Sequence, residues 1–218
     1  SVVRLRAQSP PRRPQPGRPR RTTPVPPTVT KAERGLLRIV GGRWRGRRLP
    51  VLTQPGLRPT TDRVRETLFN WVAPWIEGSR CLDCFAGSGA LGLEAASRGA
   101  REVVMLERSA PAVRGLQANV AALSAGQVSV FRGDAVEWLA TTRVRPFDLC
   151  FVDPPFASEL LAPTLAQLVG RGWIAGDGMI YVESAKDEPL PPLPDSWEWY
   201  RSKVAGQVRY GLLRIVSR

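Results

Sequence analysis

From residue 80 onward, short runs of consecutive apolar residues alternate with longer segments whose apolar positions recur at helical spacing. The runs predict strands and the segments predict helices, and alternation of this kind is typical of βαβ units in a doubly wound, mostly parallel sheet. Gly99 and Gly172 follow two of the segments where helix C-caps favour glycine. The predicted strands cover 81–85, 103–106, 128–131, 147–152 and 179–182, and the predicted helices cover 90–98, 109–123, 135–142 and 158–170.

The two ends of this pattern predict hairpins. Runs at 198–204 and 208–216 are separated by only three residues, which predicts a hairpin that closes one sheet edge and completes seven strands. Before residue 80, two apolar runs at 36–40 and 47–51 flank a Gly-Gly pair and predict a second hairpin with a basic rim.

A helix is expected after the first hairpin. Thr60 or Thr61 is a suitable N-cap, and Val64, Leu68, Phe69 and Val72 then recur at helical spacing until the helix ends near Pro74. The sequence therefore predicts an α/β fold, in which a seven-stranded, mostly parallel sheet follows an N-terminal hairpin and helix extension.

Charge divides the chain into three parts: a tail at 1–36, the basic extension at 37–78 and the α/β domain at 79–218. The net charge of +13 lies almost wholly in the first third, because residues 1–36 hold nine basic groups against one acid and residues 37–65 hold eight arginines against one. Clustered cations favour a polyanionic partner, since bound phosphates release counterions. The tail also holds eight of the 21 prolines and shows no apolar periodicity, so we expect it to be disordered, with loose nucleic-acid contact at most.

Several function classes are excluded by composition. The chain has no histidine, which rules out Ser-His-Asp hydrolysis and His-ligated zinc. No stretch of about 18 uncharged apolar residues occurs, so no membrane span is expected. Three cysteines do not make a disulfide framework, which favours a reducing, cytoplasmic location.

Residues that can carry chemistry follow four consecutive predicted strands. Ligands of an open parallel sheet sit beyond the carboxyl ends of its strands. After the first strand, Gly87 and Gly89 allow a tight turn into a helix and a close approach of ligand to backbone. Together with Gly92 they have the spacing of a dinucleotide loop, but Asp83 fits an S-adenosylmethionine loop better because it can face the ammonium of the methionine moiety. A merely structural turn is the alternative.

Carboxylates also follow the second and third strands. Glu107 can accept both hydroxyls of a ribose, and Asp134 lies where an adenine amino group could be read. Either acid could instead cap the helix that follows it. The expected cofactor site comprises these positions, their neighbours and the glycine turn: Asp83, Phe85, Gly87, Ser88, Gly89, Glu107, Arg108, Asp134 and Ala135.

The most specific signal follows the fourth strand, in Asp153-Pro154-Pro155-Phe156. Two prolines hold the backbone extended and without N–H groups, so the Asp153 carboxylate and the Pro154 carbonyl become acceptors for a planar –NH₂ group. Phe156 offers a face on which a flipped-out base can stack. We call this four-residue segment the Asp153 ledge. It would aim the amine at an activated methyl group by positioning and electrostatics, and its four residues are the catalytic candidates. A Pro-Pro loop with a capping Asp is the alternative.

A run of arginines interrupted by an aromatic residue lies in the first predicted hairpin, and this pattern suits RNA contact beside the site. An exposed hairpin edge protected by charge is the alternative. The expected RNA-contacting residues are Arg43, Trp44, Arg45, Arg47, Arg48, Arg58 and Arg63.

Two further features are expected to be structural. Cys81 and Cys84 lie within one predicted strand, and only Cys150 is available as a third sulfur, so we expect buried thiols and no metal site. Six tryptophans are expected to pack in the core or an interface rather than form a base-binding platform. They are Trp71, Trp75, Trp138, Trp173, Trp197 and Trp199.

From Arg38 to about Ile215, the chain resembles the bacterial 16S ribosomal RNA guanine-N2 methyltransferases of the RsmD type. The motifs that carry the resemblance are Arg38-Ile39-Val40-Gly41-Gly42-x-Trp44-Arg45-Gly46, Leu57 through Trp71, Cys81 through Gly92, Val152 through Phe156, Ile180-Tyr181-Val182-Glu183 and Lys203-Val204-Ala205-Gly206-Gln207.

The resemblance implies a class I (Rossmann-like) methyltransferase fold, S-adenosylmethionine as donor, and a guanosine of the small-subunit RNA as acceptor, on an assembled or assembling subunit. A monomer is expected. From the residues alone, an adenine-N6 methyltransferase acting on DNA or RNA and a non-catalytic RNA-binding assembly factor remain alternatives. Guanine is favoured modestly, because its N1–H and N2 amine are two donors that one carboxylate can accept together.

Overall fold

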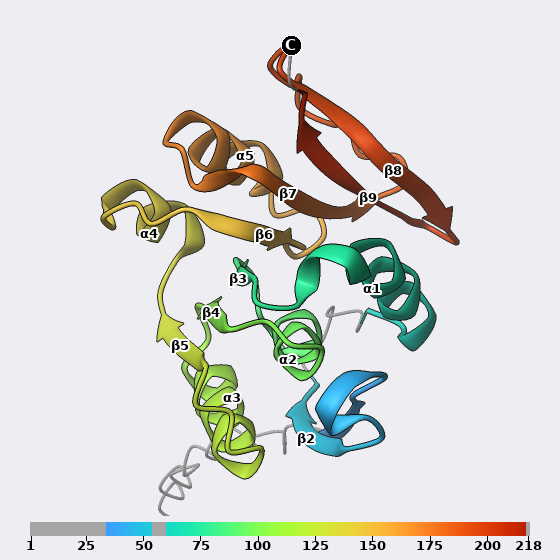
Figure 1. Cartoon of the computed structure of the whole chain (residues 1–218), viewed down its shortest axis with the longest axis vertical. Helices are drawn as coiled ribbons and strands as arrows, with labels where there is room; N and C mark the ends of the chain where they lie inside the picture. The colour runs from blue at the N-terminus through green and yellow to red at the C-terminus, as the bar shows by residue number, and fades with distance from the viewer. Residues whose placement is uncertain (1–33, 54–59, 217–218) are drawn as a thin grey trace, which may run out of the picture. The chain divides into compact units, whose positions relative to one another are not determined.

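The computed structural model describes residues 34–53 and 60–216 of the chain, and these residues belong to one compact unit. Its main sheet has seven strands in the order β5-β4-β3-β6-β7-β9-β8 (Figure 1). The predicted doubly wound, mostly parallel sheet is confirmed. Its strands are β3 (Arg80–Asp83), β4 (Glu102–Glu107), β5 (Val128–Arg132), β6 (Phe147–Val152), β7 (Ile174–Ala185), β8 (Trp197–Ala205) and β9 (Val208–Ile215).

Strands β3 to β7 run parallel, and the β8–β9 hairpin adds antiparallel to β7. The parallel strands read as continuous apolar runs because helices cover both faces of the sheet. One face packs in a core with α1, α2, α3 and the N-terminal hairpin, and the other packs with α4 and α5. The helices are α1 (Asp62–Ile76), α2 (Ala90–Ser97), α3 (Ala110–Ala122), α4 (Ala135–Thr141) and α5 (Leu161–Gly170).

Two predicted helix ends lie elsewhere than the sequence suggests. Helix α1 is capped by Thr61, as expected, but continues two residues past Pro74, whose missing N–H removes a bond only in the last turn. Helix α5 begins at Leu161 rather than at 158, because Ala157 and Glu159 have positive φ values that break the helical geometry.

The predicted N-terminal hairpin pairs β1 (Arg34–Arg38) with β2 (Arg48–Leu52), and a short 3₁₀ helix, η1 (Gly42–Trp44), lies between them. Strand β1 begins at Arg34, two residues before the expected end of the tail at residue 36. The rest of the expected tail lies outside the described residues. The hairpin packs on α2 and α3 as part of the same unit.

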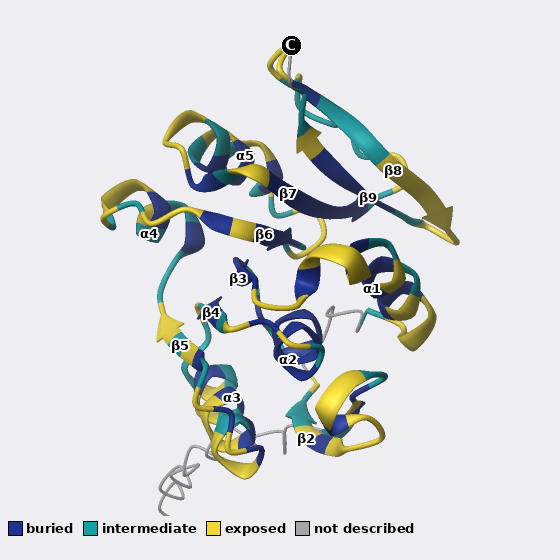
Figure 2. Cartoon of the chain, viewed as in Figure 1, coloured by how far each residue is buried: buried dark blue, intermediate teal, exposed yellow. Residues whose placement is uncertain are grey.

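A buried carboxylate fixes the hairpin to helix α2. Glu94 is fully buried and accepts hydrogen bonds from the backbone N–H groups of Val40 (3.0 Å) and Gly41 (2.8 Å). It also pairs with Arg98 at 2.9 Å and with Arg65 at 3.5 Å. The network therefore joins the hairpin, α1 and α2 around one charged group (Figure 2 shows α2 almost wholly buried).

The thiols are buried, as expected, and Cys81 and Cys84 face opposite sides of the sheet in the two separate cores. Among the tryptophans, Trp75 departs from the prediction, because its side chain is 45% exposed near the end of α1. Trp173 and Trp197 are buried, and the other three are partly buried. No described helix is long and apolar enough to cross a bilayer.

Candidate active site

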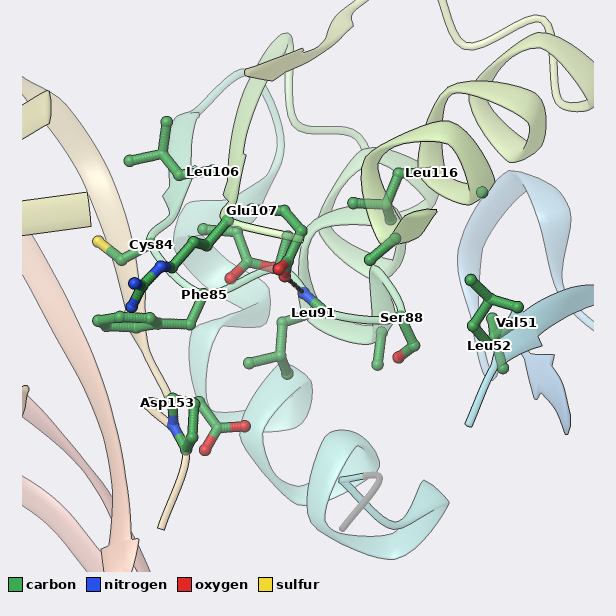
Figure 3. Close-up of a pocket in the computed structure, with 18 of the residues that line it drawn as sticks. Val51, Leu52, Cys84, Phe85, Ser88, Leu91, Leu106, Glu107, Leu116 and Asp153 are labelled. Atoms are coloured by element: carbon green, nitrogen blue, oxygen red, sulfur yellow. Dashed lines mark hydrogen bonds between the residues drawn. The ribbon is translucent and has the colours of Figure 1, made fainter. Parts of the chain in front are cut away.

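A cavity of about 340 Å³ lies at the carboxyl ends of β3, β4, β5 and β6. The strand order reverses between β3 and β6, so the cavity occupies the switch point where ligands of doubly wound sheets bind. Figure 3 shows Phe85, Glu107 and Asp153 around it, with Val51 and Leu52 of the hairpin on the opposite side. The cavity thus brings together all the predicted cofactor residues except Gly89, and the Asp153 ledge.

The glycine turn between β3 and α2 has the geometry that the sequence predicts. Gly87 and Gly89 adopt φ values of 54° and 85°, in the left-handed region that side chains disfavour. A Cβ on Gly89 would lie 2.7 Å from Leu116 and 2.9 Å from Leu93. The turn therefore requires glycine at residue 89 both for its backbone conformation and for its packing.

Glu107 helps to hold this turn. Its two carboxylate oxygens accept the N–H groups of Gly87 and Ser109, each at 2.8 Å (the first is drawn in Figure 3). Asp134 caps helix α4 by accepting the N–H of Glu137 at 2.9 Å, and it lines the cavity as well. Both acids thus have a capping or turn-stabilising role, which was the alternative to ligand binding. Their carboxylates still have lone pairs that can accept ligand hydroxyl or amino groups.

Asp83 is the most deeply buried of the predicted cofactor residues, with 1% of its surface exposed. Its Oδ2 accepts the N–H of Gly92 at 3.1 Å, and its Oδ1 has no hydrogen-bond partner among the described residues. Burial raises the pKa of Asp83 to about 7, although backbone hydrogen bonds from Gly92 and Phe85 oppose the rise. A cationic ligand group at this end of the cavity would satisfy Oδ1 and favour the ionised carboxylate.

The Asp153 carboxylate is surrounded by three polar side chains that the sequence did not indicate. The hydroxyl of Thr60 lies 3.3 Å from Asp153 Oδ2 and 3.4 Å from Glu183 Oε2. The Tyr181 hydroxyl donates to the same Glu183 oxygen at 3.2 Å. Strands β6 and β7 are paired in register at Val152 and Val182, which explains why Asp153 and Glu183 meet just beyond them.

Asp153 and Glu183 form a coupled pair of carboxyl groups. Burial, followed by repulsion from Glu183, raises the pKa of Asp153 well above its usual range, and Asp83 adds to the effect. Burial also raises the pKa of Glu183, while hydrogen bonds from Asp153, Tyr181 and Thr60 offset part of the rise. Two like charges so close cannot both ionise freely, so the pair keeps a proton to higher pH than an isolated carboxyl group would.

Comparison with known proteins identifies the family. The family model described as "Conserved hypothetical protein 95" matches residues 37–214. The chain belongs to this family. It is 52% identical over 178 residues to ribosomal RNA small subunit methyltransferase D of Escherichia coli, an alignment that covers 82% of this chain and 89% of the relative. The protein of the same name from Haemophilus influenzae is 44% identical, and the alignment covers 84% and 96% of the two chains.

Solved structures of the family share the fold. The proposed methyltransferase yhhF of Escherichia coli matches with a TM-score of 0.76 and 49% identity, covering 84% of this chain and all of that one. A proposed methylase from Haemophilus influenzae matches with a TM-score of 0.73 and 39% identity, covering 84% and 100%. The chain is therefore an RsmD-type methyltransferase with the class I fold, as its motifs imply.

The basic loop of the first hairpin, residues 41–47, lies at the C-terminal end of α2 and not beside the Asp153 ledge. Trp44, a predicted RNA contact, is 6% exposed and packs in the core, and its backbone N–H donates to Ser97 Oγ at 3.0 Å, so its side chain offers little surface to RNA. The loop contacts the C-terminal end of α2, about 12 Å along that helix from the glycine turn. Glu94 and Ser97 hold it there, away from the Asp153 ledge rather than beside it.

The other predicted RNA contacts have mixed positions. Arg43, Arg45, Arg47 and Arg48 are exposed on this loop, although Arg47 also donates to the carbonyl of Ala122. Arg63 is exposed in the first turn of α1, which begins next to Thr60 and hence near the ledge. Arg58 lies outside the described residues. Across the described part of the chain, no group of three or more His, Cys, Asp or Glu residues is arranged to hold a metal.

Proposed function

We propose that this protein transfers a methyl group from S-adenosylmethionine to the exocyclic N2 of a guanosine in small-subunit ribosomal RNA. The observation that carries the proposal is that the glycine turn, two ligand-accessible acids and the Asp153 ledge line one cavity. The relatives named ribosomal RNA small subunit methyltransferase D support the RNA substrate. The protein would act in the cytoplasm as a monomer, on an assembled or assembling small subunit.

The residues of the cavity fit the donor. The unpartnered Oδ1 of Asp83 suits the ammonium of its methionine part, and the turn at Gly87 and Gly89 lets backbone approach closely. Glu107 and Asp134 line the same cavity, so Glu107 would accept ribose hydroxyls and Asp134 would accept the adenine amino group. The donor supplies an electrophilic methyl group on a positively charged sulfur.

The ledge would hold and deprotonate the acceptor. Asp153 accepts hydrogen bonds from the guanine N1–H and N2 amine, the Pro154 carbonyl accepts the second amine hydrogen, and Phe156, 43% exposed, stacks on the base. The N2 nitrogen then forms its bond to the methyl carbon as the carbon–sulfur bond breaks. One N2 proton passes to the Asp153–Glu183 pair, whose raised pKa values suit it as an acceptor.

The decisive experiment incubates the protein with labelled S-adenosylmethionine and undermethylated small subunits, and identifies the modified nucleoside by mass spectrometry. N2-methylguanosine is the expected product. N6-methyladenosine would instead support the adenine-N6 alternative, which shares the same ledge. Absence of any labelled nucleoside, together with measurable RNA binding, would support the non-catalytic assembly factor.

Replacement of Glu183 by glutamine should move the pH profile of methyl transfer. Activity needs ionised Asp153, so kcat rises as pH rises through the pKa of that carboxyl. Removing the Glu183 charge lowers this pKa, so the rising limb should move to lower pH. The measurement is kcat against pH at saturating donor and RNA.

Asp187→Asn is the matched control, because Asp187 is an exposed acid just beyond the same strand and should leave the limb in place. A Glu183→Gln profile that only falls in height, without moving along the pH axis, would limit Glu183 to a structural role.

A further inference from the structure

The hairpin formed by β8 and β9 carries a second concentration of positive charge. Residues 200–210 hold Arg201, Lys203 and Arg209 and no acidic side chain. Arg209 donates to the carbonyl of Lys186, whereas Arg201 and Lys203 are exposed and form no salt bridge with another described residue. The hairpin is one of the family motifs, but neither the cofactor site nor the Asp153 ledge contains its tip.

Strand register places this tip at the catalytic edge of the sheet. Val208, the first residue of β9, pairs with Ala185 at the carboxyl end of β7 and with Ala205 at the end of β8. The turn at Gly206 therefore projects beyond the same edge at which Asp153 and the cavity lie. Figure 2 shows the end of β8 that leads into this turn coloured as exposed.

Register also determines which face the cations occupy. Glu183 pairs with Tyr210, and Tyr210 pairs with Lys203, so the three residues form one row across the sheet. Directly paired residues project their side chains on the same face. Strands lie about 4.8 Å apart, so the Cα of Lys203 lies about 10 Å from that of Glu183, the partner of the Asp153 ledge. Arg201, two residues earlier, pairs with Leu212 and shares this face.

The geometry points to the β8–β9 hairpin as an RNA-backbone contact, in which Lys203 and Arg201 bind phosphates next to the nucleotide held on the Asp153 ledge. This inference rests on the proposed RNA substrate. The neighbouring turn after β7 holds Lys186, Asp187 and Glu188, a net charge of −1 against the +3 of residues 200–210, so the tip stays positive. The arginine loop of the first hairpin lies at the far end of α2, so the β8–β9 tip supplies positive charge nearer the ledge.

A structural explanation for these cations makes a different prediction. Strand β8 is an edge of the sheet, and lysines on edge strands hinder pairing with other chains. In that case their removal would promote aggregation and leave RNA affinity unchanged. A phosphate contact predicts the reverse, because each lost contact reduces both affinity and its dependence on salt.

The test measures binding of the full chain to undermethylated small subunits over a salt series. Lys203→Ala and Arg201→Ala should each weaken binding about fivefold at about 0.1 M salt and lower the slope of log affinity against log salt by about 0.7. Lys203→Arg should restore both, and affinity for S-adenosylmethionine should stay unchanged in every variant. Arg143→Ala is the matched control, since Arg143 is exposed but precedes β6 at the opposite edge.

The inference is overturned if Lys203→Ala and Arg201→Ala bind RNA with the affinity and salt slope of Arg143→Ala, whether or not they aggregate. Failure of the proposed function is a separate outcome. In that case the wild-type chain methylates no small-subunit guanosine. If the wild type methylates normally and the hairpin variants bind RNA normally, only the hairpin contact is refuted.

Discussion

Asp153→Ala should lower kcat for methyl transfer by about 10³-fold, equivalent to about 4 kcal/mol of transition-state stabilisation. The variant loses the acceptor that holds the guanine donors and the group that takes the N2 proton. Binding of S-adenosylmethionine should be nearly unchanged, because Asp83 and Glu107 end other strands and Asp134 caps helix α4. Single-turnover methylation and donor binding by calorimetry measure the two quantities separately.

The fold should tolerate this change. Asp153 is partly exposed, and after its removal Glu183 keeps the hydroxyl groups of Thr60 and Tyr181 as partners. Asp177→Ala, which removes an exposed carboxylate early in β7, is the control and should keep full activity. If Asp153→Ala lost donor affinity and kept its rate with bound donor, Asp153 would belong to the cofactor site and the ledge would be misassigned.

Asp153→Asn refines the assignment of the acceptor base. An amide has one acceptor and one donor group where the carboxylate has two acceptors, so it cannot receive both guanine donors. It suits adenine better, which presents an acceptor beside its amine. A variant that keeps the activity of the wild type would therefore argue against guanine as the base on the ledge.

The main sheet could be predicted from the sequence because buried parallel strands leave uninterrupted apolar runs. The ends of those runs also located Asp83, Glu107, Asp134 and Asp153, since parallel strands finish at one edge of the sheet. Apolar periodicity and turn residues are thus enough to predict where the cavity at the switch point of the sheet lies.

Side chains that act through tertiary pairing could not be predicted in this way. Thr60 and Glu183 are 123 residues apart, and nothing local in the sequence shows that both meet Asp153. Tyr181 and Glu183 lie in a recognised family motif, but a motif gives residue types without their partners. Trp44 reads as an exposed aromatic among arginines, yet it is buried, and its contact with Ser97 joins residues 53 positions apart in the sequence.

Glu94→Ala should be the most destabilising of these substitutions, with an expected loss of about 3–5 kcal/mol in the free energy of unfolding. The change leaves the buried Arg65 and the partly buried Arg98 without this carboxylate, and it removes the acceptor for the N–H groups of Val40 and Gly41. Arg65 keeps Asp62 and the Arg38 carbonyl as partners, but Arg98 loses its carboxylate and the two N–H groups lose their acceptor inside the protein. Urea unfolding followed by circular dichroism measures the loss.

Glu94→Gln separates charge from shape. Its amide oxygen can still accept from the hairpin backbone, but its –NH₂ group faces arginines that need acceptors, so the cost should fall between those of Glu94→Ala and the wild type. Glu66→Ala, an exposed change on α1, should stay within about 0.5 kcal/mol of the wild type. A loss below about 1 kcal/mol for Glu94→Ala would mean that apolar packing alone holds the arginine loop on α2, because the charged network would then contribute no more than a surface ion pair.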